Sequence, residues 1–143
     1  MQVIRPNFEK RGGLVTVITQ DFMTKQVLML AYTDEAGYLE TLETGKAVYF
    51  STSRKKRWMK GEESGDVQRV RSVTVDCDGD ALIYFVEQKG DGACHTKAQS
   101  CFYRSAVGGL QLMEAPKAGV KEVLPFIDTQ VHTLLVVDAG CVM

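Results

Sequence analysis

The sequence predicts a mostly β fold with a single helix, on the border between the all-β and α+β classes. Most apolar segments are short, rich in Val, Ile, Thr and aromatic residues, and separated by Gly or polar residues. Only one segment has helical periodicity with end signals on both sides. With 143 residues and 45% hydrophobic residues, the chain suits one domain with its own core. We therefore expect residues 1–143 to form a single domain.

Five segments predict strands because they are apolar or alternate in polarity between breaks in the chain. In chain order they are residues 14–20, 27–32, 47–51, 67–75 and 81–88. The polar residues 21–26 predict a hairpin connection between the first two. Residues 52–66 are polar and basic, which favours a functional loop. Residues 105–143 are too apolar for a disordered tail, and we expect an extension packed on the rest.

The helix is expected directly after the second strand. Thr33 is the expected N-cap, and Asp34 and Glu35 suit the positive end of the helix dipole. Gly45 is placed where a C-cap glycine would end the helix. One face of this helix carries three apolar residues, Ala36, Leu39 and Leu42.

Composition excludes several classes of protein. The net charge of −1 gives no overall attraction to nucleic acid or to an anionic membrane. No stretch has the length of a transmembrane helix, and the first residues lack the apolar run of a signal peptide. We therefore expect a cytoplasmic protein without a membrane partner. Its four cysteines are then expected to bind metal or to be buried as thiols.

The most informative segment is residues 76–80, with the sequence DCDGD. It resembles the start of a helix–loop–helix calcium site, but Ala81 stands where that loop needs glycine, which argues against it. If the segment is extended, its carboxylates lie on one side and repel one another unless a cation or basic group neutralises them. A hard divalent metal or an acidic turn facing water both remain open. The carboxylates concerned are Asp76, Asp78 and Asp80.

The same alternation sends Cys77 to the opposite side, toward a different neighbour. Cys94 and Cys101 follow within about 25 residues, and three thiolates would bind Zn²⁺ with one position open for water. Burial as small apolar side chains is the alternative. His95 is a candidate fourth ligand or a general base beside the metal.

The basic loop offers a second candidate site. Arg54, Lys55, Arg57 and Lys60 surround Trp58, a pattern that suits nucleic-acid phosphates with a base stacked on the indole. The same residues suit the phosphates of a single nucleotide. A solvated charged loop is the third interpretation.

The chain resembles phosphoribosyl-AMP cyclohydrolase of histidine biosynthesis over roughly residues 13–104. The resemblance is carried by the segments DCDGD, VEQ, ACHT and SCFYR at residues 76–80, 86–88, 93–96 and 100–104, and by several upstream positions in the same order. Upstream it includes residues 27–32, Ser53 and Arg54, Trp58, residues 60–62, Ser64 and Gly65.

The resemblance implies hydrolytic opening of the adenine ring of 1-(5-phosphoribosyl)-AMP at its N1–C6 bond. It also implies a β pseudobarrel capped by one helix, in an intertwined homodimer. Zn²⁺ would be bound by Cys77 of one subunit with Cys94 and Cys101 of the other, and Mg²⁺ by Asp76, Asp78 and Asp80. His95 would then be the catalytic residue, with Arg54, Trp58 and Lys60 binding the nucleotide, and nucleic acid would not be a partner.

Two departures from the family keep rival functions in view. The family usually has arginine at the position of Thr52, and glycine followed by basic residues around residues 97–99, where this chain has Lys97. One rival is a metal hydrolase acting on another modified purine nucleotide. The other is a zinc-stabilised nucleic-acid-binding module that uses the basic loop.

Overall fold

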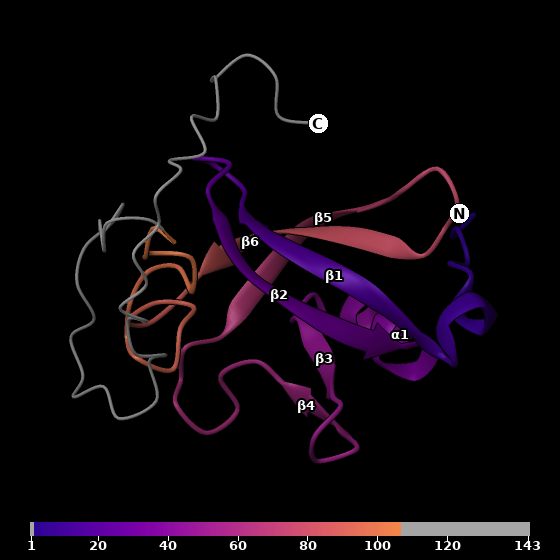
Figure 1. The fold of residues 1–143 in the computed structure, drawn as a ribbon, viewed down its shortest axis with the longest axis horizontal. Helices are drawn as coiled ribbons and strands as arrows, with labels where there is room; N and C mark the ends of the chain where they lie inside the picture. Colours follow the sequence, from indigo (N-terminus) through magenta and orange to yellow (C-terminus); the bar gives the residue numbers. More distant parts are fainter. Residues whose placement is uncertain (1, 107–143) are drawn as a thin grey trace, which may run out of the picture.

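The computed structural model describes residues 2–106, which form one curled sheet, one α-helix and one short 3₁₀ helix (Figure 1). The strands are β1 Leu14–Asp21, β2 Val27–Asp34, β3 Val48–Ser51, β4 Lys56–Met59, β5 Gln68–Val75 and β6 Ala81–Gln88. The helices are η1 Phe8–Arg11 and α1 Glu35–Thr44. The predicted mostly β class with one α-helix is confirmed. The expected extension over residues 105–143 lies almost entirely outside the described residues.

The sheet has the strand order β4-β3-β2-β1-β6-β5. Neighbouring strands are antiparallel except β1 and β6, which run parallel in the middle of the sheet. An isolated antiparallel bridge joins Lys46, just before β3, to Arg69 in β5. The sheet therefore curls toward itself as a half-barrel, with α1 lying inside the curve (Figure 1). This agrees with the half-barrel implied by the resemblance.

The core lies on the concave side of the sheet. Alternate residues of β1 and β6 are almost fully buried, as strand geometry requires. The largest buried side chains are Tyr49, Tyr84, Leu28 and Leu82. Inside the core, the Tyr49 hydroxyl donates a hydrogen bond of 2.5 Å to Oε1 of Gln68. That bond satisfies polar groups which would otherwise destabilise the core. In the part of the chain that the structure describes, no helix is long and apolar enough to cross a membrane.

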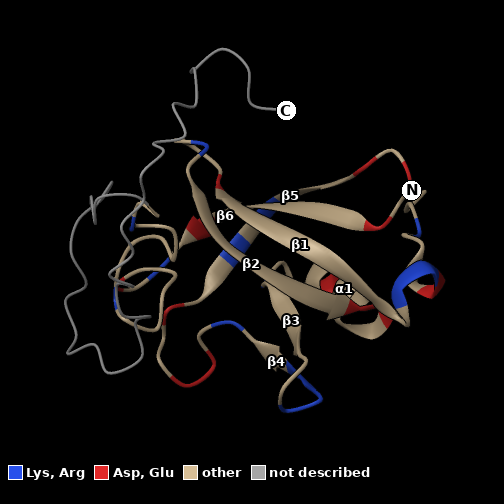
Figure 2. Cartoon of the chain, in the orientation of Figure 1, with Lys and Arg blue, Asp and Glu red and all other residues tan. Residues whose placement is uncertain are grey.

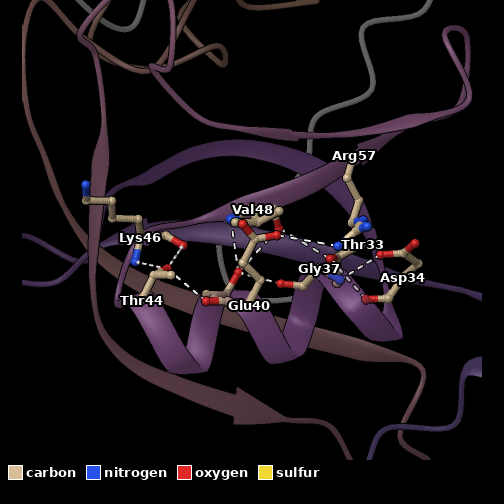
Figure 3. Close-up of polar contacts among 9 residues, drawn as sticks. Thr33, Asp34, Gly37, Glu40, Thr44, Lys46, Val48 and Arg57 are labelled. Carbon is tan, nitrogen blue, oxygen red and sulfur yellow. Dashed lines mark hydrogen bonds and ion pairs between the residues drawn. The ribbon is translucent and has the colours of Figure 1, made fainter.

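Helix α1 begins one residue later than the sequence predicts. Asp34, and not Thr33, is the N-cap: its Oδ1 accepts a hydrogen bond of 2.8 Å from the Gly37 amide (Figure 3). Thr33 is buried at the end of β2 and donates a hydrogen bond of 3.3 Å to the Val48 carbonyl. Because β2 continues to residue 34, Thr33 still belongs to the strand, and its hydroxyl bonds to the neighbouring strand β3 instead of capping the helix. The predicted end at Gly45 is confirmed, with φ of 72°.

Two further details differ from the sequence prediction. The buried face of α1 carries Gly37, Tyr38 and Thr41, whereas Leu39 and Leu42 are exposed. Residues 52–66 are not all loop, because 56–59 form β4, which pairs with β3. The segment is basic yet half-buried at Trp58, whose ring lies 5.2 Å from the ring of Tyr49. An aromatic contact across two strands thus outweighs the polar composition.

Replacing Asp34 with Ala should lower the free energy of unfolding by about 1 kcal/mol, because the Gly37 amide loses its only side-chain acceptor at the helix start. Asp34→Asn keeps an acceptor oxygen and should stay close to wild type. Glu43→Ala, on the exposed surface of the same helix, is the matched control. Urea unfolding followed by circular dichroism measures all three, and equal losses in the three variants would contradict the assigned cap.

Candidate active site

The three predicted magnesium ligands come together in the turn between β5 and β6. One carboxylate oxygen from each of Asp76, Asp78 and Asp80 lies within 4.8 Å of the others. The segment is a turn and not an extended strand, because Asp76 Oδ1 accepts backbone hydrogen bonds from Asp80 at 3.1 Å and Ala81 at 3.3 Å. Carboxylate oxygens are the ligands that Mg²⁺ prefers, so the donor set fits this ion.

Two basic side chains from η1 already face this acidic turn. Lys10 Nζ lies 2.5 Å from Asp78 Oδ2 and 3.3 Å from Asp80 Oδ2, and Arg11 Nε lies 3.0 Å from the same Asp80 oxygen. Figure 2 shows the basic helix beside the acidic turn. Sequence analysis missed this contact, since the partners are 68 residues or more apart. The sequence carries no local signal for this contact, because Glu9 directly precedes Lys10 and Arg11 as a nearer acidic residue.

These cations make Asp80 strongly acidic. The hydrogen bond from Arg11 is the main reason that its pKa falls to about 2, with further hydrogen bonds from Asp78, Lys10 and Asp76 acting in the same direction. Asp80 is therefore ionised throughout the neutral range. A divalent ion at this turn would compete with Lys10 and Arg11 for the same oxygens.

Two of the three predicted zinc ligands also meet, on the loop after β6. The Cys94 thiol lies close enough to that of Cys101 to raise its pKa. Although Cys101 as a residue is exposed, burial of its thiol is the main reason that its pKa rises to about 12, and the neighbouring Cys94 adds to this. The Thr96 hydroxyl donates a hydrogen bond of 2.9 Å to Cys94 Sγ. Two converging thiols fit a soft metal such as Zn²⁺.

Of the predicted nucleotide-binding residues, Lys60 lies nearest to the thiols. Burial lowers the pKa of Lys60, and the charges of Cys101, Asp66 and Cys94 oppose this effect, so its ammonium group lies within electrostatic range of the thiol pair. Lys60 Nζ also lies 5.9 Å above the Trp58 ring, within cation–π range. The structure therefore gathers Trp58, Lys60 and the thiol pair on one side of the half-barrel.

Arg54 and His95 are placed differently. Arg54 is exposed in the turn between β3 and β4, at the opposite end of β4 from Lys60. Its backbone amide donates a hydrogen bond of 3.2 Å to the Ser51 hydroxyl, so this contact fixes the backbone of Arg54 within the turn. His95 is exposed and follows Cys94 directly in the loop. Within one chain, His95 is therefore next to Cys94 because the two residues are neighbours in the sequence. Arg54 lies in a separate turn.

Cys77 does not join the other two cysteines within one chain. It is exposed in the acidic turn before β6, whereas Cys94 and Cys101 follow β6, and Figure 1 shows these segments at opposite ends of the strand. Eight residues at about 3.3 Å each separate the two ends by roughly 25 Å. Zinc–sulfur bonds of about 2.3 Å require thiolates that almost touch. Within a single chain, the acidic turn and the thiol pair are therefore too far apart to share one metal ion.

A pocket of about 470 Å³ lies elsewhere, between the end of α1 and the start of β5. None of the predicted site residues lines it, and its charged side chains are Lys46, Arg69 and Lys89. This pocket therefore does not coincide with the candidate active site.

Comparison with known proteins identifies the family. Residues 29–103 match the family model described as phosphoribosyl-AMP cyclohydrolase. A phosphoribosyl-AMP cyclohydrolase from Archaeoglobus fulgidus is 62% identical over 96 residues, covering 67% of this chain and 88% of the relative. One from Syntrophotalea carbinolica is 55% identical over 101 residues, covering 71% of this chain and 81% of the relative. The chain therefore belongs to the phosphoribosyl-AMP cyclohydrolase family, as the resemblance predicted.

A longer relative matches over the same part of the chain. The histidine biosynthesis bifunctional protein HisIE from Aquifex aeolicus is 56% identical over 96 residues, which cover 67% of this chain and 47% of that protein. All predicted site residues lie inside the stretch covered by the family model, from Arg54 to Cys101.

In metal-free protein, replacing Arg11 with Gln should raise the pKa of the Asp80 carboxyl from about 2 toward its usual value of 3.8. Because the folded pKa lies below the unfolded one, Asp80 contributes stability above about pH 4, and this is lost as the pH falls toward 2. The variant should lose less stability over that range. Titration of the side-chain carboxyl ¹³C signals by NMR measures the shift. Arg5→Gln, whose partners are Glu9 and Glu35, is the control and should leave Asp80 unchanged.

Proposed function

We propose that this chain is a phosphoribosyl-AMP cyclohydrolase of histidine biosynthesis, which opens the adenine ring of 1-(5-phosphoribosyl)-AMP at the N1–C6 bond by hydrolysis. Membership of the family supports this activity. The observation that carries it is that the Cys94 and Cys101 thiols approach each other on the loop after β6, with Lys60 within electrostatic range of both. A soft-metal site next to a basic side chain suits the hydrolysis of a phosphorylated nucleotide.

The active form in this proposal is a homodimer with its zinc site shared between subunits. Cys94 and Cys101 supply two thiolates, and the third, Cys77, lies at the far end of β6 in the same chain. A second copy can present its own acidic turn to the thiol pair, and two-fold symmetry then creates two equal sites. Thiolate ligands must stay reduced, which supports a cytoplasmic location.

The position of Cys77 between Asp76 and Asp78 has a consequence for magnesium. Any subunit that delivers Cys77 to the partner's thiols also delivers the carboxylates on either side of it. The hard and soft sites, which are far apart in one chain, then become neighbours in the dimer. Mg²⁺ at the aspartates would serve to hold phosphate oxygens of the nucleotide close to the thiol site.

Exposed apolar side chains also support association with a second copy. Leu30 and Tyr32 on β2 are 48% and 40% exposed, and they point away from the core on the outer face of the sheet. Ile18 of β1 stands opposite Leu30, and Phe50 of β3 stands opposite Tyr32. A row of apolar side chains across three strands is typical of a surface that is covered in the assembled protein.

The chemistry requires an activated water and a proton donor for the departing nitrogen. Substitution at N1 leaves the amidine of the purine cationic, so that C6 is already electrophilic. When bound, zinc supplies the acidity that makes water a nucleophile near neutral pH. His95 takes the proton from that water and delivers it to N1 as the N1–C6 bond breaks.

The remaining side chains orient the substrate. Trp58 is held by its contact with Tyr49, and its ring offers a flat surface to the nucleotide. Lys60 is half-buried beside the thiols, where a positive charge attracts the phosphorylated substrate. Arg54, exposed at the tip of the β3–β4 turn, is placed to reach a phosphate at the substrate's far end.

Replacing His95 with Ala should leave zinc bound but reduce turnover by about 10²-fold or more, because the proton loses its carrier. The measurement is a spectrophotometric assay with phosphoribosyl-AMP, Zn²⁺-loaded protein and added Mg²⁺, together with a zinc assay on each variant. Cys101→Ala should lose both zinc and turnover. If His95→Ala loses its zinc, His95 is a ligand. A folded, zinc-loaded wild type without turnover would overturn the proposed activity.

Complementation tests the shared site. Cys77→Ala and Cys101→Ala should each be inactive alone, because each site in either homodimer lacks one thiolate. After the two are unfolded together and refolded, half of the dimers are mixed, and each mixed dimer has one complete site. Activity should therefore return to about a quarter of wild type. A mixture of Cys94→Ala and Cys101→Ala is the control and should stay inactive. If the first mixture also stays inactive, the three cysteines do not join across subunits.

A further inference from the structure

The turn that carries Cys94 is held by an unusual residue at its tip. Lys97 has φ of 68°, a left-handed conformation that normally favours glycine. Its amide donates a hydrogen bond of 2.9 Å to the Cys94 carbonyl, and the Cys94 amide donates one of 3.2 Å to the Ala98 carbonyl. The position of Cys94 therefore depends on a lysine staying in a conformation that a free chain would avoid.

The side chain of Lys97 is fixed by a buried carboxylate. Lys97 Nζ lies 2.7 Å from Asp66 Oδ2, and Asp66 is only 5% exposed. Burial by itself raises the pKa of Asp66, but the hydrogen bonds from Lys97 and from the Asp91 amide more than offset it, so that the pKa is lowered. Both groups of the pair are therefore charged at neutral pH, and removing Lys97 leaves the Asp66 carboxylate buried without its partner, whereas the Lys97 ammonium group is partly exposed.

Asp66 also grips the loop at a second point. Its Oδ1 accepts a hydrogen bond of 2.9 Å from the Asp91 amide, and a Cβ at Gly90 would lie 2.1 Å from the same oxygen. One carboxylate thus contacts the loop both before Cys94 and after it. This side chain thus fastens residues 91–97 to the segment before β5, which also holds the start of the loop through the hydrogen bond of 2.9 Å from the Lys89 amide to the Val67 carbonyl.

Cys101 is anchored independently, on β2. Its amide donates a hydrogen bond of 2.7 Å to the Leu28 carbonyl, and the Ser100 hydroxyl donates one of 2.7 Å to the Val27 carbonyl. Asp66 and Lys97 contribute nothing to these contacts. The distance between the two thiols thus depends on the attachment of Cys101 to β2 and on that of the Cys94 turn to Asp66, in addition to the backbone hydrogen bonds that join residues 93–94 to residues 98–99.

We propose that Asp66 is a positioning residue for the metal: through its ion pair with Lys97 it fixes Cys94 at the separation from Cys101 that zinc requires. This rests on the proposed zinc site and adds a residue that touches neither the metal nor the substrate. Second-sphere groups of this kind typically change metal affinity about 10- to 100-fold. The Asp66–Lys97 ion pair also sets how the two thiolates are arranged around the metal, and a tetrahedral metal ion bound there reports this arrangement directly.

The test measures metal binding and not turnover. Asp66→Asn and Lys97→Gln should each weaken Zn²⁺ binding by about 10-fold or more in competition with a chromophoric chelator. The double variant should be no weaker than the worse single one, because both changes remove the same interaction. Lys97→Arg keeps the charge and should recover most of the affinity. With Co²⁺ in place of Zn²⁺, the visible absorption bands of the two single variants should shift or lose intensity.

Asp91→Asn is the matched control. Its carboxylate is also near Lys97 Nζ, at 4.0 Å, but its side chain is 66% exposed, so zinc affinity and the cobalt spectrum should stay at wild-type values. Lys97 is partly exposed, so Lys97→Gln serves if Asp66→Asn does not fold. If folded Asp66→Asn or Lys97→Gln keeps the wild-type zinc affinity and cobalt spectrum, even with a lowered Tm, the positioning role of Asp66 is overturned. The proposed zinc site itself would then still stand. A wild type that binds no zinc would overturn the zinc site and the inference with it.

Discussion

Strand β6 pairs with β1 on one side and with β5 on the other. Its eight residues separate the turn before the strand from the loop after it. The turn before it carries Cys77 and the aspartates, and the loop after it carries Cys94 and Cys101. A strand in the middle of a sheet cannot fold back on itself, so these groups stay about 25 Å apart within one chain. The proposed shared metal site follows from this length.

Each half of the proposed active site is stabilised by charges from outside the predicted motifs. Lys10 and Arg11 neutralise the acidic turn, and Asp66 fastens the loop of Cys94 through Lys97. Ion pairs therefore hold the segments that carry the proposed metal ligands. The cost of gathering like-charged carboxylates at one turn is met by protein cations, which a divalent ion would have to displace.

The fold could be predicted well where a local rule decides the structure. The apolar run of residues 81–88 predicted β6 at its observed limits, and Gly45 was correctly predicted as the C-cap of α1. The errors came where distant contacts decide it. Thr33 is used by the neighbouring strand β3, so Asp34 caps the helix, and the contact of Trp58 with Tyr49 makes a strand from a basic segment.

The sequence by itself determined the family, the mostly β class and the types of candidate ligand, because these depend on residue identity and on spacing along the chain. It also brought Asp76, Asp78 and Asp80 together, since a single turn is enough to do so. Only the tertiary structure decided that Cys77 lies apart from the other thiols and that Asp66 holds Lys97. Those relations join segments through the direction of β6 and the curl of the sheet, which no local pattern encodes.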